Sequence, residues 1–263
     1  MSAKTNPQQS VVSPAEAVPG SRAWHKQQRE QQLLQLAQQL LQQDGFTGLT
    51  MDRLTAVSEV SKGTIYNHFC SKEDLITALS VDSLQRQLQL FQRALSIPGN
   101  SREQVLALHL AYHRFSETEP TLFLCLLTAT TPGVVEKSSA ARLAVRQQLE
   151  LQLAAMCGQL ITQAIAKGDL QLPSGQSIDA LAFVQWAQAF GSNALFKPTQ
   201  QLGLFSQLQP QTAVLLGINL LLDGLQWKPQ SADWDYHASW QRIQAILAAD
   251  MSVAKINRID EIP

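Results

Sequence analysis

The spacing of the prolines is the feature that most restricts how this chain can fold. Eleven prolines occur in 263 residues, yet none lies between Pro19 and Pro98 or between Pro132 and Pro173. An internal proline removes a helical hydrogen bond and clashes with the preceding turn, so long helices need such stretches. Apolar residues recur there at helical spacing, as in the stripe of Leu33, Leu36, Ala37, Leu40 and Leu41.

Signals for β-structure are missing from the same stretches. No segment alternates apolar and polar residues for long, and no Asn-Gly pair marks a hairpin. The sequence therefore predicts an all-α fold of about ten helices.

Small polar residues mark where several helices should begin. Thr50, Ser61 and Ser71 are suited to cap helices that start at the next residue, because a hydroxyl oxygen accepts from a free N–H of the first turn. The helix that holds the leucine stripe should end near Gly45, since glycine adopts the left-handed conformation that closes many helices. These signals predict helices over residues 51–58 and 62–69 and a long one after Ser71.

Similar signals divide the rest of the chain. Ser101-x-x-Gln104 has the form of a capping box, and Pro120 suits the first position of a helix. The helices expected from these signals cover residues 101–116, 120–127, 139–168, 177–196 and 211–227, followed by an amphipathic stretch with Trp234, Trp240, Ile243 and Leu247.

Composition and the lack of catalytic motifs exclude several classes of protein. The net charge is −1, so no overall field attracts nucleic acid or membrane, and three cysteines without a Cys-x-x-Cys pair favour a reducing compartment. The most apolar stretch, residues 212–225, is too short to span a bilayer. No nucleophile elbow, P-loop or dinucleotide fingerprint occurs. We expect a cytoplasmic protein with a disordered tail over residues 1–20, no enzymatic activity, no cofactor and no membrane partner.

The helices predicted over residues 51–58 and 62–69 form a helix-turn-helix pattern. Apolar residues spaced to bury this pair against the first helix are Leu54, Val57, Val60, Ile65 and Phe69. The opposite face of the second helix is polar and carries Lys62, Gly63, Thr64, Tyr66, Asn67 and His68. Because an α-helix fits the major groove of B-DNA, this face is a candidate for reading DNA.

The stretch GFTGLTMDRLTAVSEVSKGTIYNHFCSKEDLITAL, residues 45–79, resembles the N-terminal DNA-binding domain of the TetR family of bacterial transcriptional regulators. The resemblance covers residues 24–79 and implies a DNA-binding domain over residues 21–80. It also implies an all-α ligand-binding and dimerisation domain over residues 81–263. The resemblance further implies that two copies of the chain form a homodimer. This homodimer is expected to bind a palindromic operator in double-stranded DNA as a repressor, and a small-molecule effector is expected to release it.

The resemblance also implies which residues touch DNA. Phosphate contacts are expected from Thr50, Tyr66, His68 and Lys72. Groove-facing positions are Lys62, Gly63, Thr64 and Asn67, and the candidate interface further includes Arg53 and Ser61.

Two features depart from the family pattern. The turn usually contains Ala-Gly-Val-Ser, whereas here Glu59 takes the glycine position, which would cost about 1 kcal/mol if its backbone were left-handed. The charges of residues 21–80 also cancel, so non-specific binding to DNA should be weak and affinity must come from local placement of charge.

Two histidines in the second domain leave three interpretations open. His109 and His113 lie one helical turn apart, with Glu117 a further turn on, which is acceptable metal-ligand spacing. They could instead contact an effector, or be ordinary partly exposed histidines.

The second domain also holds candidates for a ligand pocket and a dimer interface. Besides the two histidines, the pocket candidates are Phe123, Leu126, Met156, Phe183 and Trp186, all of which could equally be core. The interface candidates on the helix over residues 211–227 are Val214, Gly217, Ile218, Leu221 and Leu225. Those on the preceding helix are Ala182, Gln185 and Ala189, and the alternative is that both helices are buried within one subunit.

Two other functions stay open on the sequence. One is a regulator that is independent of effectors or activates transcription, which would bind DNA with an affinity indifferent to small molecules. The other is an α-helical metal-binding protein that uses His109 and His113.

Overall fold

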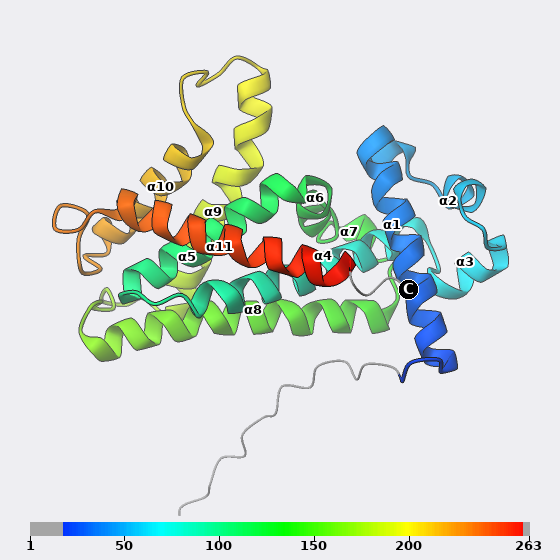
Figure 1. Ribbon diagram of the computed structural model, residues 1–263, viewed down its shortest axis with the longest axis horizontal. Coiled ribbons are helices and arrows are strands. Elements are labelled where there is room, and N and C mark those ends of the chain that lie inside the picture. Colours follow the sequence, from blue (N-terminus) through cyan, green and yellow to red (C-terminus); the bar gives the residue numbers. More distant parts are fainter. Residues whose placement is uncertain (1–17, 260–263) are drawn as a thin grey trace, which may run out of the picture. The chain divides into compact units, whose positions relative to one another are not determined.

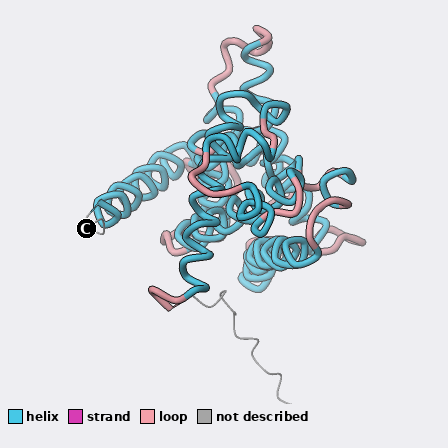
Figure 2. The backbone as a smooth tube through the Cα atoms, turned by 90° about the vertical axis from the view of Figure 1, so that its right-hand side faces the viewer, coloured by secondary structure: helices cyan, strands magenta, loops and turns pink. Residues whose placement is uncertain are grey.

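The computed structural model describes residues 18–259, and for residues 197, 198, 200 and 250–259 it describes the backbone only. This part of the chain contains eleven helices and no strand, which confirms the all-α prediction (Figures 1 and 2). The chain divides into two compact units, residues 1–69 and 70–263. Most of the predicted tail, residues 1–17, lies outside the described residues.

The first unit consists of three helices, α1 (Arg22–Gly48), α2 (Met51–Val57) and α3 (Lys62–His68). Gly45 interrupts α1 with a φ of 65°, close to where the sequence places the end of the helix. Thr50 Oγ1 accepts from the N–H of Arg53 at 3.1 Å, and Ser61 Oγ accepts from the N–H of Thr64 at 3.2 Å. Both predicted caps are therefore present, and they set the two helix starts.

Buried leucines hold the first unit together. Leu33, Ala37 and Leu54 are almost wholly buried, as are Ile65 and Phe69. Val57 differs from the prediction because its side chain is 49% exposed. It is the last residue of α2, where the chain turns away toward α3.

The second unit is a bundle built around one buried helix (Figure 1). Its helices are α4 (Lys72–Leu95), α5 (Ser101–Thr118), α6 (Pro120–Thr128), α7 (Pro132–Val135), α8 (Ala140–Lys167), α9 (Ile178–Gln201), α10 (Pro210–Gly224) and α11 (Tyr236–Ile259). Helix α5 contacts α4, α6, α8, α9, α10 and α11, so most of its side chains are buried. No helix in the described part is long and apolar enough to cross a membrane.

Several helix ends agree with the sequence signals, and one start differs by a residue. Ser71 Oγ accepts from the N–H of Asp74 at 2.9 Å, and Gly168 closes α8 with a φ of 79°. The capping box of α5 is formed by Asn100 and Glu103, whereas the sequence analysis placed it at Ser101. Ser101 Oγ instead donates to an Asp169 carboxylate oxygen at 2.6 Å, so its hydroxyl serves tertiary packing.

A buried arginine fixes the connection between α10 and α11. The side chain of Arg102 is fully buried, and its Nη1 donates to Asp223 Oδ1 at 2.6 Å and to the carbonyl oxygen of Trp227 at 2.9 Å. The guanidinium also lies 4.5 Å from the ring centroid of Tyr236. A charge this deep is tolerated because both terminal nitrogens donate to acceptors and the ring of Tyr236 lies against the guanidinium, while Nε has no partner. No pattern in the sequence indicates this cluster, because Arg102 lies more than a hundred residues from the partners of its guanidinium.

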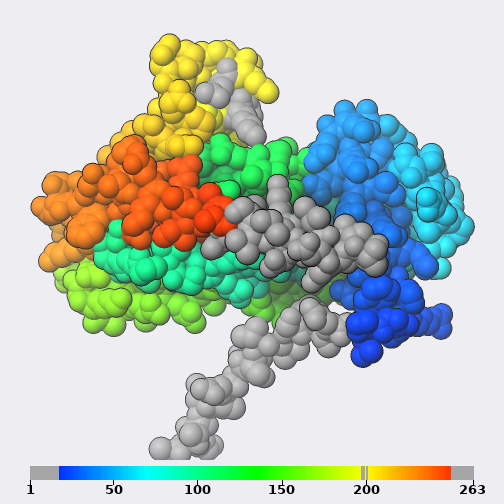
Figure 3. Space-filling view, in the orientation of Figure 1, coloured from blue at the N-terminus to red at the C-terminus, as the bar shows by residue number. Residues whose placement is uncertain are grey.

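The end of α9 and the start of α10 project from the second unit (yellow in Figures 1 and 3). The turn between them exposes Leu202, Leu204 and Phe205, whose side chains are 75%, 51% and 69% exposed. Large apolar side chains in such a position are typical of a surface that a partner covers.

Candidate nucleic-acid interface and ligand cavity

Helix α3 presents one buried and one exposed face. Ile65 and Phe69 are fully buried, whereas Tyr66 is 43% exposed and Asn67 is also exposed. Gly63 is exposed as well, and a Cβ added there would approach only Ser61 Oγ, at 3.9 Å. The exposed face therefore offers an aromatic hydroxyl, an amide and an open stretch of backbone.

Two of the three cations predicted to contact DNA, Lys62 and Arg53, form ion pairs within the first unit. Lys62 Nζ lies 2.7 Å from Asp52 Oδ1, and Arg53 Nη2 lies 2.5 Å from Asp44 Oδ2. The hydrogen bond and charge of Asp52 raise the pKa of Lys62 above its ordinary value. Phosphates must therefore compete with carboxylates for these cations, which strengthens the expectation of weak non-specific binding.

His68 does not lie on the exposed face, so this part of the prediction is wrong. Its side chain is buried, and Nδ1 lies 3.2 Å from Glu30 Oε2 of α1. Residues 65, 68 and 69 share one side of a helix, and that side faces inward. His68 is thus part of the packing between α1 and α3.

The turn between α2 and α3 is free of the predicted strain. Within the described part of the chain, positive φ values at residues other than glycine occur at Phe205 and Gln226 only. Glu59 therefore takes an ordinary backbone conformation, and the predicted cost of about 1 kcal/mol does not arise. Instead, Ser58 Oγ donates to the carbonyl oxygen of Thr55 at 3.3 Å and closes α2.

The remaining candidates for DNA contact lie at helix starts. Thr50 and Ser61 are exposed, although each uses its hydroxyl oxygen as an N-cap. Thr64 is half-buried, and its Oγ1 lies 3.0 Å from Ser61 Oγ. Lys72 is the first residue of α4, belongs to the second unit and is half-buried.

A small cavity lies inside the second unit, between α4, α5, α8 and α9. Its volume is about 50 Å³. Its walls are formed by Phe91, Val105, Leu108, His109, Tyr112, Cys157, Leu160, Ala182, Gln185, Trp186 and Ala189. Trp186 is 53% exposed although it lines the cavity, so it stands at the mouth.

Two side chains of this cavity carry polar atoms without partners. His109 and Gln185 are 6% and 9% exposed, and neither His109 Nδ1 nor Gln185 Nε2 has a hydrogen-bond partner. Burial lowers the pKa of His109 to about 4, so the ring is neutral at pH 7. Buried polar atoms are rarely left unpaired, which makes this pair a candidate binding site.

His109 and His113 do not converge on a common point. His113 Nδ1 lies 2.7 Å from Asn193 Oδ1 of α9, whereas His109 lines the cavity. His113 Nε2 lies 3.6 Å from Glu117 Oε1, beyond ordinary hydrogen-bonding distance. The described residues contain no group of three His, Cys, Asp or Glu side chains placed to hold a metal ion.

The pocket prediction is only partly matched by the cavity. His109 and Trp186 line it, but Phe123 is buried elsewhere and stacks on Phe190 at 5.3 Å between ring centroids. Phe183 is 62% exposed, and Leu126 and Met156 are half-buried outside the cavity wall. Gln185 lines the cavity although its place on the helix suggested the dimer interface, because one amide on an apolar helix carries no sign of which contact it makes.

Four of the predicted interface residues are buried within the chain, whereas Ala182, Gly217, Leu221 and Leu225 are half-buried. Val214 and Ile218 are 2% and 0% exposed within the chain, and Gln185 and Ala189 belong to the cavity wall. A Cβ on Gly217 would lie 2.1 Å from Gln188 Nε2, so this glycine allows α10 to approach α9 of the same chain. The exposed apolar residues of the two helices are instead Phe183, Val184, Trp186, Leu195, Leu216 and Leu220.

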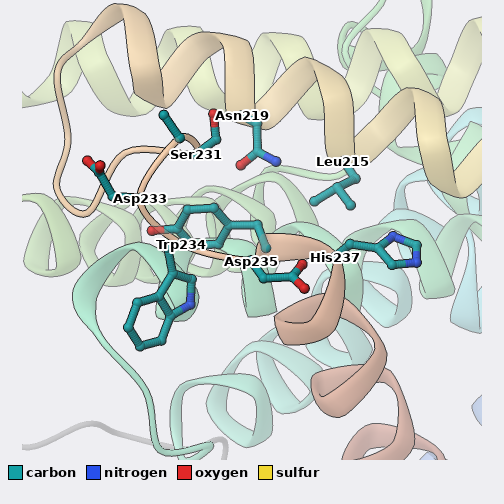
Figure 4. A pocket seen from close by; sticks show the side chains of 9 residues that line it. Leu215, Asn219, Ser231, Asp233, Trp234, Asp235 and His237 are labelled. Carbon is teal, nitrogen blue, oxygen red and sulfur yellow. The ribbon is translucent and has the colours of Figure 1, made fainter.

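A second, more open cavity lies between α10 and the start of α11 (Figure 4). It measures about 570 Å³, and its wall includes Asn219, Trp234 and Asp235. Asp235 Oδ1 accepts from the N–H of Ala238 and Trp234 Nε1 donates to Ser239 Oγ, so both side chains have structural partners.

A short helix that follows a tight turn, packs on other helices with one side and leaves a polar side exposed is the arrangement of a helix-turn-helix motif. Residues 33–79 match the family model of bacterial regulatory proteins, tetR family. Over these residues the match confirms the resemblance seen in the sequence.

Curated relatives match part of the chain. The HTH-type transcriptional repressor NemR of Escherichia coli K12 is 30% identical over 142 residues, or 52% of this chain and 66% of NemR. An uncharacterised HTH-type transcriptional regulator of Mycobacterium bovis is 32% identical over 83 residues, or 30% of this chain and 37% of that protein. The matches thus span less than two thirds of either relative.

Solved structures share the fold over most of the chain. A tetR-family regulatory protein from Rhodococcus RHA1 has a TM-score of 0.57 at 15% identity, covering 74% of this chain and 96% of that one. FadR from Bacillus subtilis, solved in complex with stearoyl-CoA, has a TM-score of 0.58 at 13% identity, covering 74% and 98%. At these identities the likeness shows the fold alone.

Proposed function

We propose that this protein is a transcriptional repressor that inserts α3 into the major groove of operator DNA. The observation that carries the proposal is the exposed face of α3, where Tyr66 and Asn67 stand beside an open Gly63 while Ile65 and Phe69 anchor the helix. NemR, which is 30% identical to this chain over 142 residues, is a transcriptional repressor.

The proposed contacts follow from position on the helix. Thr64 and Asn67 read base edges, since amide and hydroxyl groups pair with them in the major groove. Tyr66, Thr50 and Lys72 hold phosphates, which position the helix without reading sequence. Lys62 and Arg53 reach phosphate only by leaving their present carboxylate partners.

A second copy of this chain is the proposed partner of the second unit. The exposed side chains of α9 and α10, with Phe183 62%, Leu195 63% and Leu220 66% exposed, form an apolar surface that water would otherwise meet. Pairing these helices across a two-fold axis buries that surface and presents two copies of α3 to a palindrome.

An effector in the cavity beside α5 is proposed to release the operator. Helix α9 forms part of the cavity wall and also carries exposed apolar side chains of the proposed dimer surface. A ligand that moves α9 would therefore alter the spacing of the two subunits. The coupling free energy between an effector site and a DNA-binding site is typically about 1–3 kcal/mol.

Selection of DNA from a random duplex pool tests this function. The purified full-length protein should enrich a palindrome, and enrichment should persist when the salt concentration is raised to remove non-specific binding. The absence of any enriched sequence would contradict the proposal. An enriched site without two-fold symmetry would contradict the dimer while leaving specific DNA binding intact.

A further inference from the structure

We propose that the cavity between α4, α5, α8 and α9 takes a small uncharged apolar molecule with one carbonyl oxygen, held by Gln185 and His109. This inference rests on the proposed role of the cavity as the effector site. It adds the chemical class of the ligand, which follows from the wall of the cavity.

The polar part of the ligand is defined by two unpaired atoms. Gln185 Nε2 and His109 Nδ1 are both buried without partners, and they lie on α9 and α5, which face each other across the cavity. Leaving a buried polar group unpaired is unfavourable, so a ligand atom that pairs with it is bound in preference to one that does not. A carbonyl oxygen accepts from the amide of Gln185, and a neutral imidazole can donate a second bond.

The wall excludes charged ligands. No lysine, arginine, aspartate or glutamate lines the cavity. His109 cannot supply a positive charge either, because burial lowers its pKa to about 4. A carboxylate or an ammonium group would therefore be buried without a counter-charge, which is strongly unfavourable.

The rest of the wall favours an apolar body bound without covalent chemistry. The rings of Phe91 and Tyr112 meet edge to face, with centroids 6.2 Å apart, and Leu108 and Leu160 complete the apolar wall. Burial raises the pKa of the Cys157 thiol to about 11, so it is not a nucleophile at neutral pH. The volume of about 50 Å³ is several times the ~10–15 Å³ that one water needs.

Matched trios of probes test the proposal on the full-length protein by isothermal titration calorimetry. One trio is acetophenone, α-methylstyrene and benzoate, and the other is cyclohexanone, methylenecyclohexane and cyclohexanecarboxylate. Within a trio the shape is nearly constant while the carbonyl is replaced by an alkene or a carboxylate. We expect at least one ketone to bind, its alkene to bind on the order of tenfold more weakly, and its carboxylate to bind more weakly still.

The variant Gln185→Leu separates the hydrogen bond from the apolar contacts. It should abolish the preference for ketone over alkene and leave binding of the alkene itself unchanged or stronger. The variant should fold, since it replaces an unpaired buried amide by an apolar group of similar size. Gln163→Leu is the matched control, because Gln163 is exposed on α8 and does not line the cavity.

The outcomes distinguish the ligand class from the proposed function. Binding of a carboxylate as tight as that of its ketone, or no binding of any neutral probe, overturns the ligand class. If the selected operator is still bound in that case, the repressor function stands. If a ketone binds in a Gln185-dependent way but no DNA is selected, the ligand class stands and the repressor function fails.

Discussion

At the scale of single residues, Asn67 and His68 show how one position on a helix decides a role. The two are neighbours in sequence, yet Asn67 is exposed while His68 is buried against Glu30. The difference comes from the helical period, which places residue 68 on the same side as Ile65. If polar character were the only criterion, both side chains would be predicted to contact DNA.

Asn67→Ala should weaken binding to the selected operator without changing the fold. Loss of a base contact costs on the order of 1–3 kcal/mol, and specificity at the contacted base pair should relax. Fluorescence anisotropy with operator DNA measures this, and the melting temperature should be unchanged because Asn67 is exposed. Gln31→Ala, an exposed change on α1, is the control. Equal affinity of the Asn67 variant and the control would remove Asn67 from the interface.

Asp52→Asn should strengthen non-specific binding to DNA. The change frees Lys62 from a partner at 2.7 Å and removes one negative charge beside the proposed interface. One additional phosphate contact should steepen the plot of log affinity against log salt by about 1. Asp233→Asn makes the same change in charge at an exposed site of the second unit. A similar slope in both variants would mean that only net charge matters.

At the scale of elements, local chemistry determines where the helices begin and end. It does not determine which other helices each of them contacts. The caps at Thr50, Ser61 and Ser71 lie where the sequence places them. The start of α5 differs because Asn100 and Ser101 are adjacent candidate caps, and the choice depends on Asp169 and Trp227, far along the chain. A capping signal is local, whereas competition between two such signals is settled by packing.

Arg102→Met should strongly destabilise the second unit. It leaves the carboxylate of Asp223 and the carbonyl oxygen of Trp227 without the guanidinium that they now share. Removing one partner of a fully buried ion pair typically costs about 3–5 kcal/mol, and because the Asp223 side chain is 30% exposed the loss should lie at the lower end of this range. The free energy of unfolding is measured in urea, with Arg93→Met, exposed on α4, as the control. A loss below about 1 kcal/mol, the usual size for a surface site, would show that the cluster is not a structural anchor.

At the scale of the whole molecule, the choice of face on α9 and α10 decides how copies of the chain assemble. Both helices are apolar on more than one side, so their sequence is compatible with two interfaces. The fold uses the side with Ile218 for its own core and leaves the side with Leu220 exposed.

Leu220→Glu should therefore convert the proposed dimer to a monomer that still folds. The Leu220 side chain is 66% exposed in the single chain, so a glutamate at this position stays hydrated and hardly changes the stability of the monomer. Inside an apolar interface the same charge would lose its hydration, which is strongly unfavourable. Analytical ultracentrifugation gives the mass, and Leu151→Glu, 63% exposed on α8, is the control that should remain dimeric. If the Leu220 variant stays dimeric, copies associate through another surface.

The sequence by itself determined the class of fold, the helix-turn-helix and its caps, because these depend on residues a few positions apart. Helical period, proline spacing and the pattern over residues 45–79 were sufficient for them. Only the tertiary structure decided the inward side of α10, the burial of His68, and the placement of His109 and Gln185 in the wall of one cavity. These depend on contacts between residues far apart in sequence, and an apolar helix or a lone polar side chain carries no local sign of which neighbour it will meet.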